Sequence, residues 1–361
     1  MISDAKHPSL NSLIRGLFLT PIASHRQWGL VLAVALAYTL IPQLPLPNDW
    51  ALNTSGLSKG LNAYADGSFV YPPWALILLW PYRWLTIPGT RAASVLVVGW
   101  LASKRRWTLL RFSTIVISPY FIWTMILCNL DVLSLLLPVL LWETAEGKAW
   151  RNVGRSVSCL LLLLKPQSGI LMIIYLCWRH RQPIRGLLAP LVVVMLVTIP
   201  ISALGKPPLF YQWIQNTIID PSRQNLEYWR INNTSLTAHV GWLPGSLIVA
   251  ASLCGTYLLM RSLDRKWAEQ HTYAGIFAVS MLLGPYASNQ GLIVPLALLA
   301  SWPALVMQYV VLYIAPQVGV GRENSTWWAL TLVIGALCFY RPVPDEPRDG
   351  LVSSRGSSGS E

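Results

Sequence analysis

Charged residues are scarce in this sequence, and acidic residues are the scarcest of them. Asp, Glu, Lys and Arg together make up 12% of the 361 residues, whereas they make up about 25% of an ordinary soluble domain. Hydrophobic residues make up 54% of the chain, and many of its 18 tryptophans stand close to the ends of apolar runs. Tryptophan prefers that position because its ring suits the headgroup layer of a bilayer. The composition therefore predicts an integral membrane protein with several spans.

The sequence also lacks the common motifs for nucleotide phosphates, hydrolytic nucleophiles and catalytic zinc. It has no Walker loop, no Gly-x-Gly-x-x-Gly segment after a strand, no His-Glu-x-x-His and no Gly-x-Ser-x-Gly. The five cysteines lie scattered in apolar stretches without the spacing of metal ligands, which predicts buried free thiols. We therefore assign no metal ligand and no cofactor, and the sequence argues against an ATP-driven pump.

The net charge of +12 raises the question of a nucleic-acid partner. The chain has no long basic stripe with interleaved aromatic residues, so we expect no nucleic acid to bind. Short basic clusters between apolar runs are instead typical of cytoplasmic loops under the positive-inside rule. Four such clusters are KRRW at 104–107, RNVGR at 151–155, WRHRQPIR at 178–185 and RSLDRKW at 261–267.

The apolar runs predict an all-α fold, a transmembrane bundle of about 10–12 spans that forms one domain over residues 1–340. Residues 341–361 are rich in Pro, Gly and Ser and predict a disordered tail. No cleavable signal precedes the first run, so we expect that run to be retained. With the basic clusters inside, the expected spans lie near 28–46, 90–103, 108–128, 131–142, 155–165, 168–178, 186–204, 245–260, 273–287, 291–313 and 326–340.

Two long polar segments, 47–70 and 205–244, then fall on the extracytoplasmic face and are expected to carry short juxtamembrane helices. The apolar stretch 71–89 is interrupted by four prolines and by Arg83. A full span there would invert every later basic loop, so we interpret it as a broken or juxtamembrane helix on the outer side. We expect a multi-pass protein of a plasma membrane of the bacterial type, with its functional site outside the cytoplasm.

One apolar run carries a lysine at its centre. The run SCLLLLLKPQSGILMIIYLCWRHR extends from Ser158 to Arg181, and Lys165 stands in its middle. A lysine at the centre of a spanning helix costs about 2.5–3.5 kcal/mol on insertion scales. Lys165 therefore marks a turn between two shorter helices, lies in a protected cavity, or does both.

Several short runs predict a recess in the outer leaflet. Spanning the hydrocarbon takes roughly 20 residues, and the runs on both sides of Lys165 are much shorter. Irregular backbone is tolerated at membrane depth where it lines a wet cavity. We expect the recess to be lined by CNLD at 128–131, KPQ at 165–167 and GPYASNQG at 284–291.

Asp131 is the only acid between Asp66 and Glu143, and it begins an apolar run. One interpretation makes Asp131 the N-cap of an interfacial helix and Lys165 a snorkelling lysine at a turn. The other pairs the two side chains, because they fall on the same side of the membrane and each charge would be costly alone.

The outer segments hold further candidates. The first contains Asp49, which stands next to a span, and Asp66, which lies in a turn-like ADGS sequence typical of a solvated loop. The second contains Arg223, Arg230 and His239 among aromatic and amide side chains. Arginine suits phosphate recognition because its guanidinium binds two oxygens at once, although a solvated loop with incidental cations is equally compatible.

The order of these elements resembles a family. The chain presents Asp49–Trp50, YPP at 71–73, CNLD at 128–131, LKPQ at 164–167, NNTSL at 232–236 and GPYASNQG at 284–291. In this order, over about residues 28–300, it is similar to the integral-membrane sugar transferases of the C-type superfamily. Within that superfamily it most resembles glycosyltransferase family 87, the polyprenol-phosphate-mannose-dependent type. It departs from many relatives in having CN where they have Gly-Asn or Gly-Gln.

The resemblance implies transfer of a sugar, mannose in the most similar enzymes, from a polyprenyl phosphate to an acceptor on the extracytoplasmic face. Asp49 matches the catalytic acid that the superfamily places in its first outer loop. In this hypothesis Lys165, Arg223 and Arg230 bind the donor phosphate. The cavity is lined by Tyr71, Asn129, Asp131, Gln167, Asn233, His239 and Asn289. The expected partners are the lipid-linked donor, membrane lipid and a glycan or glycolipid acceptor.

Two other functions stay open. The first is a transporter or flippase for a lipid-linked or small solute, with Asp131 and Lys165 as an intramembrane gating pair. The sequence shows no internal repeat, which argues mildly against the repeat-built transporters. Polar segments concentrated on one face also favour the enzyme. The second alternative is an inactive homologue that serves as a membrane scaffold.

Overall fold

The structure is a computed structural model in which every described secondary-structure element is a helix. It describes residues 19–43, 49–64, 69, 71–145, 148–180, 184–216, 235–262, 269–284, 289–300 and 306. These ranges contain no β-strand, and an isolated bridge joins Pro21 to Thr108. The all-α class expected from the sequence is confirmed for this part of the chain.

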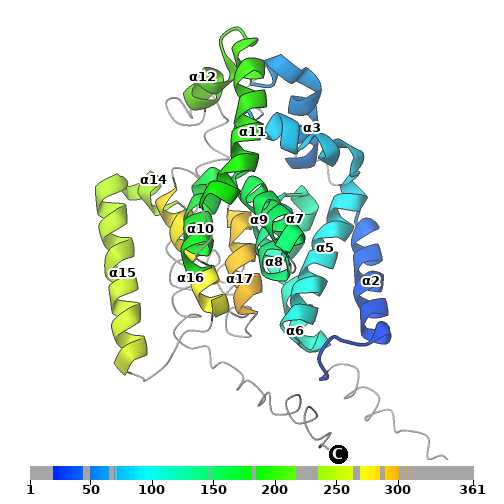
Figure 1. Cartoon of the computed structure of the whole chain (residues 1–361). Helices are drawn as coiled ribbons and strands as arrows, with labels where there is room; N and C mark the ends of the chain where they lie inside the picture. The colour runs from blue at the N-terminus through cyan, green and yellow to red at the C-terminus, as the bar shows by residue number, and fades with distance from the viewer. Residues whose placement is uncertain are drawn as a thin grey trace, which may run out of the picture.

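A bundle of packed helices forms the body of the molecule (Figure 1). In it α2 lies along α5, α8 along α9, and α10 and α17 both pack against α16. Two further helices join the bundle: α11 (Ile184–Ala203) packs against α9 and extends to the top of Figure 1, and α15 (Trp242–Ser262) stands at one side. The bundle helices are α2 (His25–Thr39), α5 (Ile87–Lys104), α6 (Leu109–Val116), α7 (Pro119–Leu127), α8 (Leu137–Thr144), α9 (Lys148–Leu162), α10 (Pro166–Arg179), α16 (Glu269–Leu283) and α17 (Ile293–Leu299).

Short helices form a cap over one end of the bundle, at the top of Figure 1. The cap has its own apolar core, which includes Leu57, Tyr64, Phe69 and Tyr71. Gly56 is required there, because a Cβ at this position would lie 2.4 Å from Cδ2 of Phe69. The helices of the cap are α3 (Asp49–Lys59), η1 (Gly60–Asn62), α4 (Ala75–Leu78), η2 (Trp80–Trp84) and α12 (Leu209–Ile214).

The stretch 71–89 is broken, as predicted. It forms α4 and η2, and the chain then turns by 103° into α5. Pro81 stands at the start of η2, and the side chain of Thr86 accepts a hydrogen bond from the backbone of Gly89 to begin α5. The location of this break on the outer side of a membrane stays a prediction.

Membrane-spanning length is reached only by bent helix pairs in the described part of the chain. No single described helix is both long and apolar enough to cross a bilayer. Two bent pairs meet the length and composition required, Ala75–Trp84 with Ile87–Lys104 and Leu109–Val116 with Pro119–Leu127. The expected span at 108–128 is therefore two helices meeting at 56°, because Ser118 and Pro119 begin a new helix. The number of spans stays a prediction, and the expected span at 326–340 lies outside the described residues.

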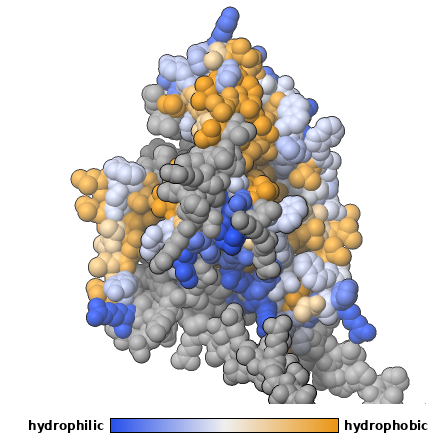
Figure 2. Space-filling model, viewed as in Figure 1, coloured by the Kyte–Doolittle hydropathy of each residue, from blue (hydrophilic) through white to orange (hydrophobic). Residues whose placement is uncertain are grey.

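The outward faces of α2 and α15 carry exposed apolar side chains. Leu32 and Leu36 are exposed on α2, as is Leu40 just after it, although the opposite face of this helix is buried against α5. On α15 the exposed side chains include Leu243, Leu247 and Leu258. Figure 2 shows apolar residues over α15, with polar residues at the lower end of this helix. Helices that are apolar on both faces are typical of proteins that face lipid.

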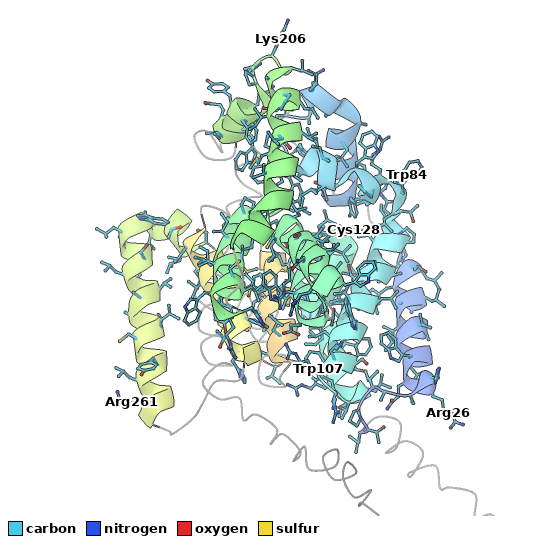
Figure 3. All side chains as sticks on the ribbon, in the orientation of Figure 1. Arg26, Trp84, Trp107, Cys128, Lys206 and Arg261 are labelled. Atoms are coloured by element: carbon cyan, nitrogen blue, oxygen red, sulfur yellow. The ribbon has the colours of Figure 1, made fainter. Side chains whose placement is uncertain are left out.

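Labelled basic residues lie at both ends of the molecule, so the alternating topology stays a prediction. Arg26, Trp107 and Arg261 lie toward one end, and Lys206 lies at the other (Figure 3). One loop prediction is wrong, because RNVGR at 151–155 is part of α9, which begins at Lys148. The helix extends over this cluster because it combines buried and exposed faces, with Arg155 buried and Arg151 exposed.

Candidate functional site

Lys165 lies in a tight turn between α9 and α10. Pro166 is the first residue of α10, a position that tolerates proline because the backbone N–H there has no partner within the helix. The Lys165 carbonyl accepts hydrogen bonds from the backbone N–H groups of Ser168 and Gly169. A Cβ on Gly169 would lie 2.1 Å from the carbonyl oxygen of Leu162, so only glycine permits this close return. The expected turn at Lys165 is confirmed.

Asp131 also stands at a helix break. Helix α7 ends at Leu127, and the next residue, Cys128, has a left-handed backbone with φ 54°. Residues 132–136 form a π-helical segment before α8. Asn129 fixes the connection, because its Oδ1 accepts a 2.8 Å hydrogen bond from the backbone N–H of Asp131. The Asp131 side chain makes no capping hydrogen bond. Asp131 therefore occupies the N-cap position of the π-helical segment, but its side chain does not cap that segment.

The two breaks bring Asp131 and Lys165 together. Lys165 Nζ forms an ion pair with Asp131 Oδ1, and the two side chains are 14% and 1% exposed. Lys165 thus points into the protein and does not snorkel to its surface. The pairing interpretation is confirmed, and the Lys165–Asp131 pair is the centre of the candidate site.

The residues around the pair come from two further segments and from the first turn of α10. Lys165 Nζ lies 5.8 Å from the centre of the Tyr71 ring, a geometry in which the ring face attracts a cation. A Cβ on Gly291 would lie 3.4 Å from Asp131 Oδ2, so the end of the GPYASNQG segment reaches the carboxylate. Gln167 is half-buried in the first turn of α10. The structure therefore brings together parts of the three segments that were expected to line a recess.

The cap covers the candidate site from one end. The indole N–H of Trp74 donates a 2.9 Å hydrogen bond to the carbonyl of Leu163, two residues before Lys165. The indole N–H of Trp50 donates to the carbonyl of Leu85 and ties α3 to the end of η2. Sequence reasoning missed Trp74 and Gly291 as individual residues, although both stand in segments that it singled out, the stretch 71–89 and GPYASNQG.

Asp49 is the first residue of α3 in this cap, and its side chain lies outside the described part of the structure. Asn53, one helical turn later, is 3% exposed. His239 is in α14 (Leu236–Val240) and Asn289 begins η6 (Asn289–Leu292), again with only the backbone described. Four other candidates lie outside the described residues, namely Asp66, Arg223, Arg230 and Asn233. Their roles stay predictions.

Within the described ranges, no three His, Cys, Asp or Glu side chains lie together as ligands for a metal ion. Comparisons of the chain with protein-family models, with curated proteins and with solved structures give no match. Geometry and residue chemistry therefore carry the functional argument.

Proposed function

We propose that this protein is a membrane-embedded glycosyltransferase that moves a sugar from a polyprenyl phosphate donor to an acceptor hydroxyl. The observation that carries the proposal is the buried Lys165–Asp131 pair beneath the cap. Replacing a buried ion pair by well-packed apolar residues is often neutral or stabilising, so a buried pair is weak evidence for stability. A cation retained at a break between helices suits a ligand anion better than it suits packing.

Lys165 has three N–H donors, and Asp131 accepts one of them. In the proposed reaction the positive charge of Lys165 attracts the donor phosphate, while Asp131 holds the ammonium group in place before the donor arrives. The phosphate leaves with the electron pair of the broken anomeric C–O bond, and the nearby cation stabilises the charge that develops. Arg223 and Arg230 are assigned to the same phosphate.

Asp49 is the general base of the proposal. It takes the proton of the acceptor hydroxyl as that oxygen forms a bond to the anomeric carbon. Two features support its placement: Asp49 begins a helix of the cap that covers the Lys165–Asp131 pair, and a buried residue follows one turn later. The apolar outward faces of α2 and α15 support a location in a membrane, where the polyprenyl tail is soluble.

A transfer assay with a short-chain polyprenyl phosphate sugar and membrane extract as acceptor tests this function. Asp49→Asn keeps the size of the side chain and removes its proton affinity, so transfer should fall by about 10²–10⁴-fold while donor binding persists. Asp66→Asn, in the same polar segment, is the matched control and should retain the wild-type rate. An Asp49→Asn protein as fast as wild type would show that another group is the base.

The ion pair also favours a second candidate, a transporter or flippase in which Lys165 and Asp131 form a gate. Such a gate opens when the two charges separate and a substrate or coupling ion replaces one partner. Proteoliposomes containing a labelled lipid-linked sugar distinguish the two functions. Movement of the label across the bilayer without covalent transfer identifies a transporter, whereas label joined to an acceptor identifies the enzyme.

A further inference from the structure

A second buried cation lies on α9, far from Lys165. Arg155 is 8% exposed, and its guanidinium carbon lies 5.1 Å from the centre of the Trp142 ring on α8. The Trp142 ring in turn contacts the ring of His180, which follows α10, at 5.8 Å between centres. Ten residues separate Arg155 from Lys165, so the two cations are roughly 15 Å apart along the helix direction.

The stacked side chains leave buried hydrogen-bond donors without acceptors. Neither Nε nor Nη1 of Arg155 has a hydrogen-bond partner, and Nε1 of Trp142 has none either. Buried N–H groups of this kind are rare in folded proteins, because each one gives up water without a replacement. Three such donors on two stacked side chains indicate a place where acceptor atoms are supplied by something other than the described protein groups.

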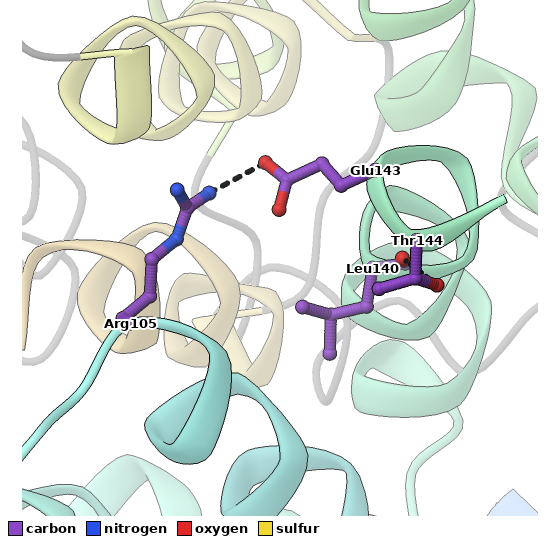
Figure 4. Close-up of polar contacts among 4 residues, drawn as sticks. All are labelled: Arg105, Leu140, Glu143 and Thr144. Carbon is purple, nitrogen blue, oxygen red and sulfur yellow. Dashed lines mark hydrogen bonds and ion pairs between the residues drawn. The ribbon is translucent and has the colours of Figure 1, made fainter. Parts of the chain in front are cut away.

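The neighbouring acid is occupied elsewhere. Glu143, next to Trp142 in the chain, forms an ion pair with Arg105 at the end of α5 (Figure 4). No ion pair joins Arg155 to a carboxylate among the described residues. Arg151, one turn earlier on α9, adds a further positive charge near Arg155. The Arg155–Trp142 cluster therefore lies in positive surroundings and is rich in donors.

We propose that Arg155 and Trp142 bind a phosphate group at the end of the bundle opposite the cap. A phosphate offers only acceptor oxygens, so it suits a cluster of unpaired N–H donors. The planar guanidinium can bind two of its oxygens at once while one face remains on the indole ring. The ligand is a phospholipid headgroup of the adjacent leaflet or a soluble phosphate compound. This site is independent of the proposed sugar transfer, because Arg155 and Lys165 are roughly 15 Å apart along the helix direction.

Thermal unfolding of the full chain in an uncharged detergent tests the site. The probes are dioctanoyl phosphatidic acid, dioctanoylglycerol as the same lipid without phosphate, and inorganic phosphate at ionic strength matched with chloride. A ligand that binds only the folded protein raises its Tm with concentration. We expect wild type to show a saturable rise of about 3 °C or more with one phosphate probe and none with dioctanoylglycerol.

Three variants make the test specific. Arg155→Gln should lose the rise, and it should fold at least as stably as wild type without ligand because a buried unpaired charge is removed. Arg155→Lys keeps the charge but lacks the planar guanidinium group. It should therefore require at least about tenfold more ligand for the same rise in Tm. Arg151→Gln removes the same charge from an exposed position and should keep most of the rise. A rise in Tm only with the lipid identifies a headgroup as the ligand, and a rise with inorganic phosphate identifies a soluble ligand.

The proposal is overturned if the phosphate probes raise the Tm of Arg155→Gln as much as that of wild type. It is also overturned if neither phosphate probe raises the Tm of wild type.

Discussion

Lys165, which is half-buried, and Asp131, which is buried, form an ion pair although 34 residues separate them in the chain. Each stands at a helix break, Lys165 before Pro166 and Asp131 after the left-handed Cys128. Neither break is made by the pair itself, since the proline and the left-handed residue set the local backbone. The helix ends therefore bring the charges close, and the ion pair then holds the ends together.

Coupling between the two charges is the first prediction. Lys165→Met or Asp131→Asn alone leaves the other charge poorly compensated, so each should lower the free energy of unfolding by about 3–5 kcal/mol. The free energy of unfolding of the double variant should fall by less than the sum of the two single losses. The difference, which is the coupling energy, should be about 1–3 kcal/mol. Equilibrium unfolding in mixed micelles gives the free energy of unfolding of wild type, of each single variant and of the double variant.

The Arg105–Glu143 pair provides a control, because the same comparison of two single variants and a double variant can be made there. Its side chains are 23% and 19% exposed, so solvent screens the interaction and the coupling between them should be at most about 1 kcal/mol. Strictly additive losses at Lys165 and Asp131 would contradict the assignment of the pair as a coupled unit.

Gly169 should be the most sensitive glycine of the candidate site. A Cβ there meets the carbonyl oxygen of Leu162 at 2.1 Å, and this backbone atom cannot rotate away as a side chain can. Gly169→Ala should lower the free energy of unfolding by about 2–3 kcal/mol or more. It should also separate α10 from α9 and so weaken the Lys165–Asp131 coupling.

Two other helical glycines serve as matched controls for Gly169. Gly29 on α2 and Gly255 on α15 have no atom within 4 Å of an added Cβ. Alanine at either position should be neutral or should stabilise the helix by about 0.5–1 kcal/mol. If Gly169→Ala changed the free energy of unfolding no more than these two variants do, the tight turn at Gly169 would be ruled out.

Alkaline pH should weaken the cap through Tyr64. Burial raises the pKa of Tyr64 well above its ordinary value, and its hydroxyl donates a 2.6 Å hydrogen bond to the carbonyl of Tyr71. The folded state therefore keeps the proton that the unfolded chain releases above about pH 10. The stabilisation from this group is complete below that pH and declines as pH rises.

The difference between wild type and Tyr64→Phe isolates this contribution. At neutral pH the variant should be about 1 kcal/mol less stable, because it lacks the hydrogen bond. Between about pH 10 and 11 the deficit should shrink by about 1 kcal/mol, since only wild type has this ionisable group. Parallel curves of unfolding free energy against pH would show that Tyr64 ionises equally in both states.

The predicted topology can be tested by cysteine labelling in a cysteine-free background. Ser58 on α3 and Asn152 on α9 are both exposed, and the alternating spans place them on opposite sides of the membrane. A membrane-impermeant thiol reagent added outside intact cells should label Ser58→Cys and not Asn152→Cys. The reverse pattern would invert the topology and remove the extracytoplasmic site. Permeabilised cells, in which both positions should react, provide the control.

The sequence by itself determined the helical class and several helix boundaries. Apolar runs without strand-like alternation predicted helices, and proline predicted the breaks before α10 and within 71–89, because a proline removes a backbone donor wherever the chain folds. Composition also singled out Lys165 and Asp131, since a charge within an apolar run is costly before any contact is known. These are local properties, and local properties can be read from a sequence.

Only the tertiary structure decided which charges have partners. Lys165 finds Asp131 because α7, α9 and α10 pack so that two helix ends meet, and that packing depends on the whole bundle. Arg155 looked like one more loop cation, but α9 extends over it and buries it on Trp142 without an acceptor. The difference arises because the cost of a charge depends on its own residue, whereas the compensation of that charge depends on neighbours that are distant in the chain.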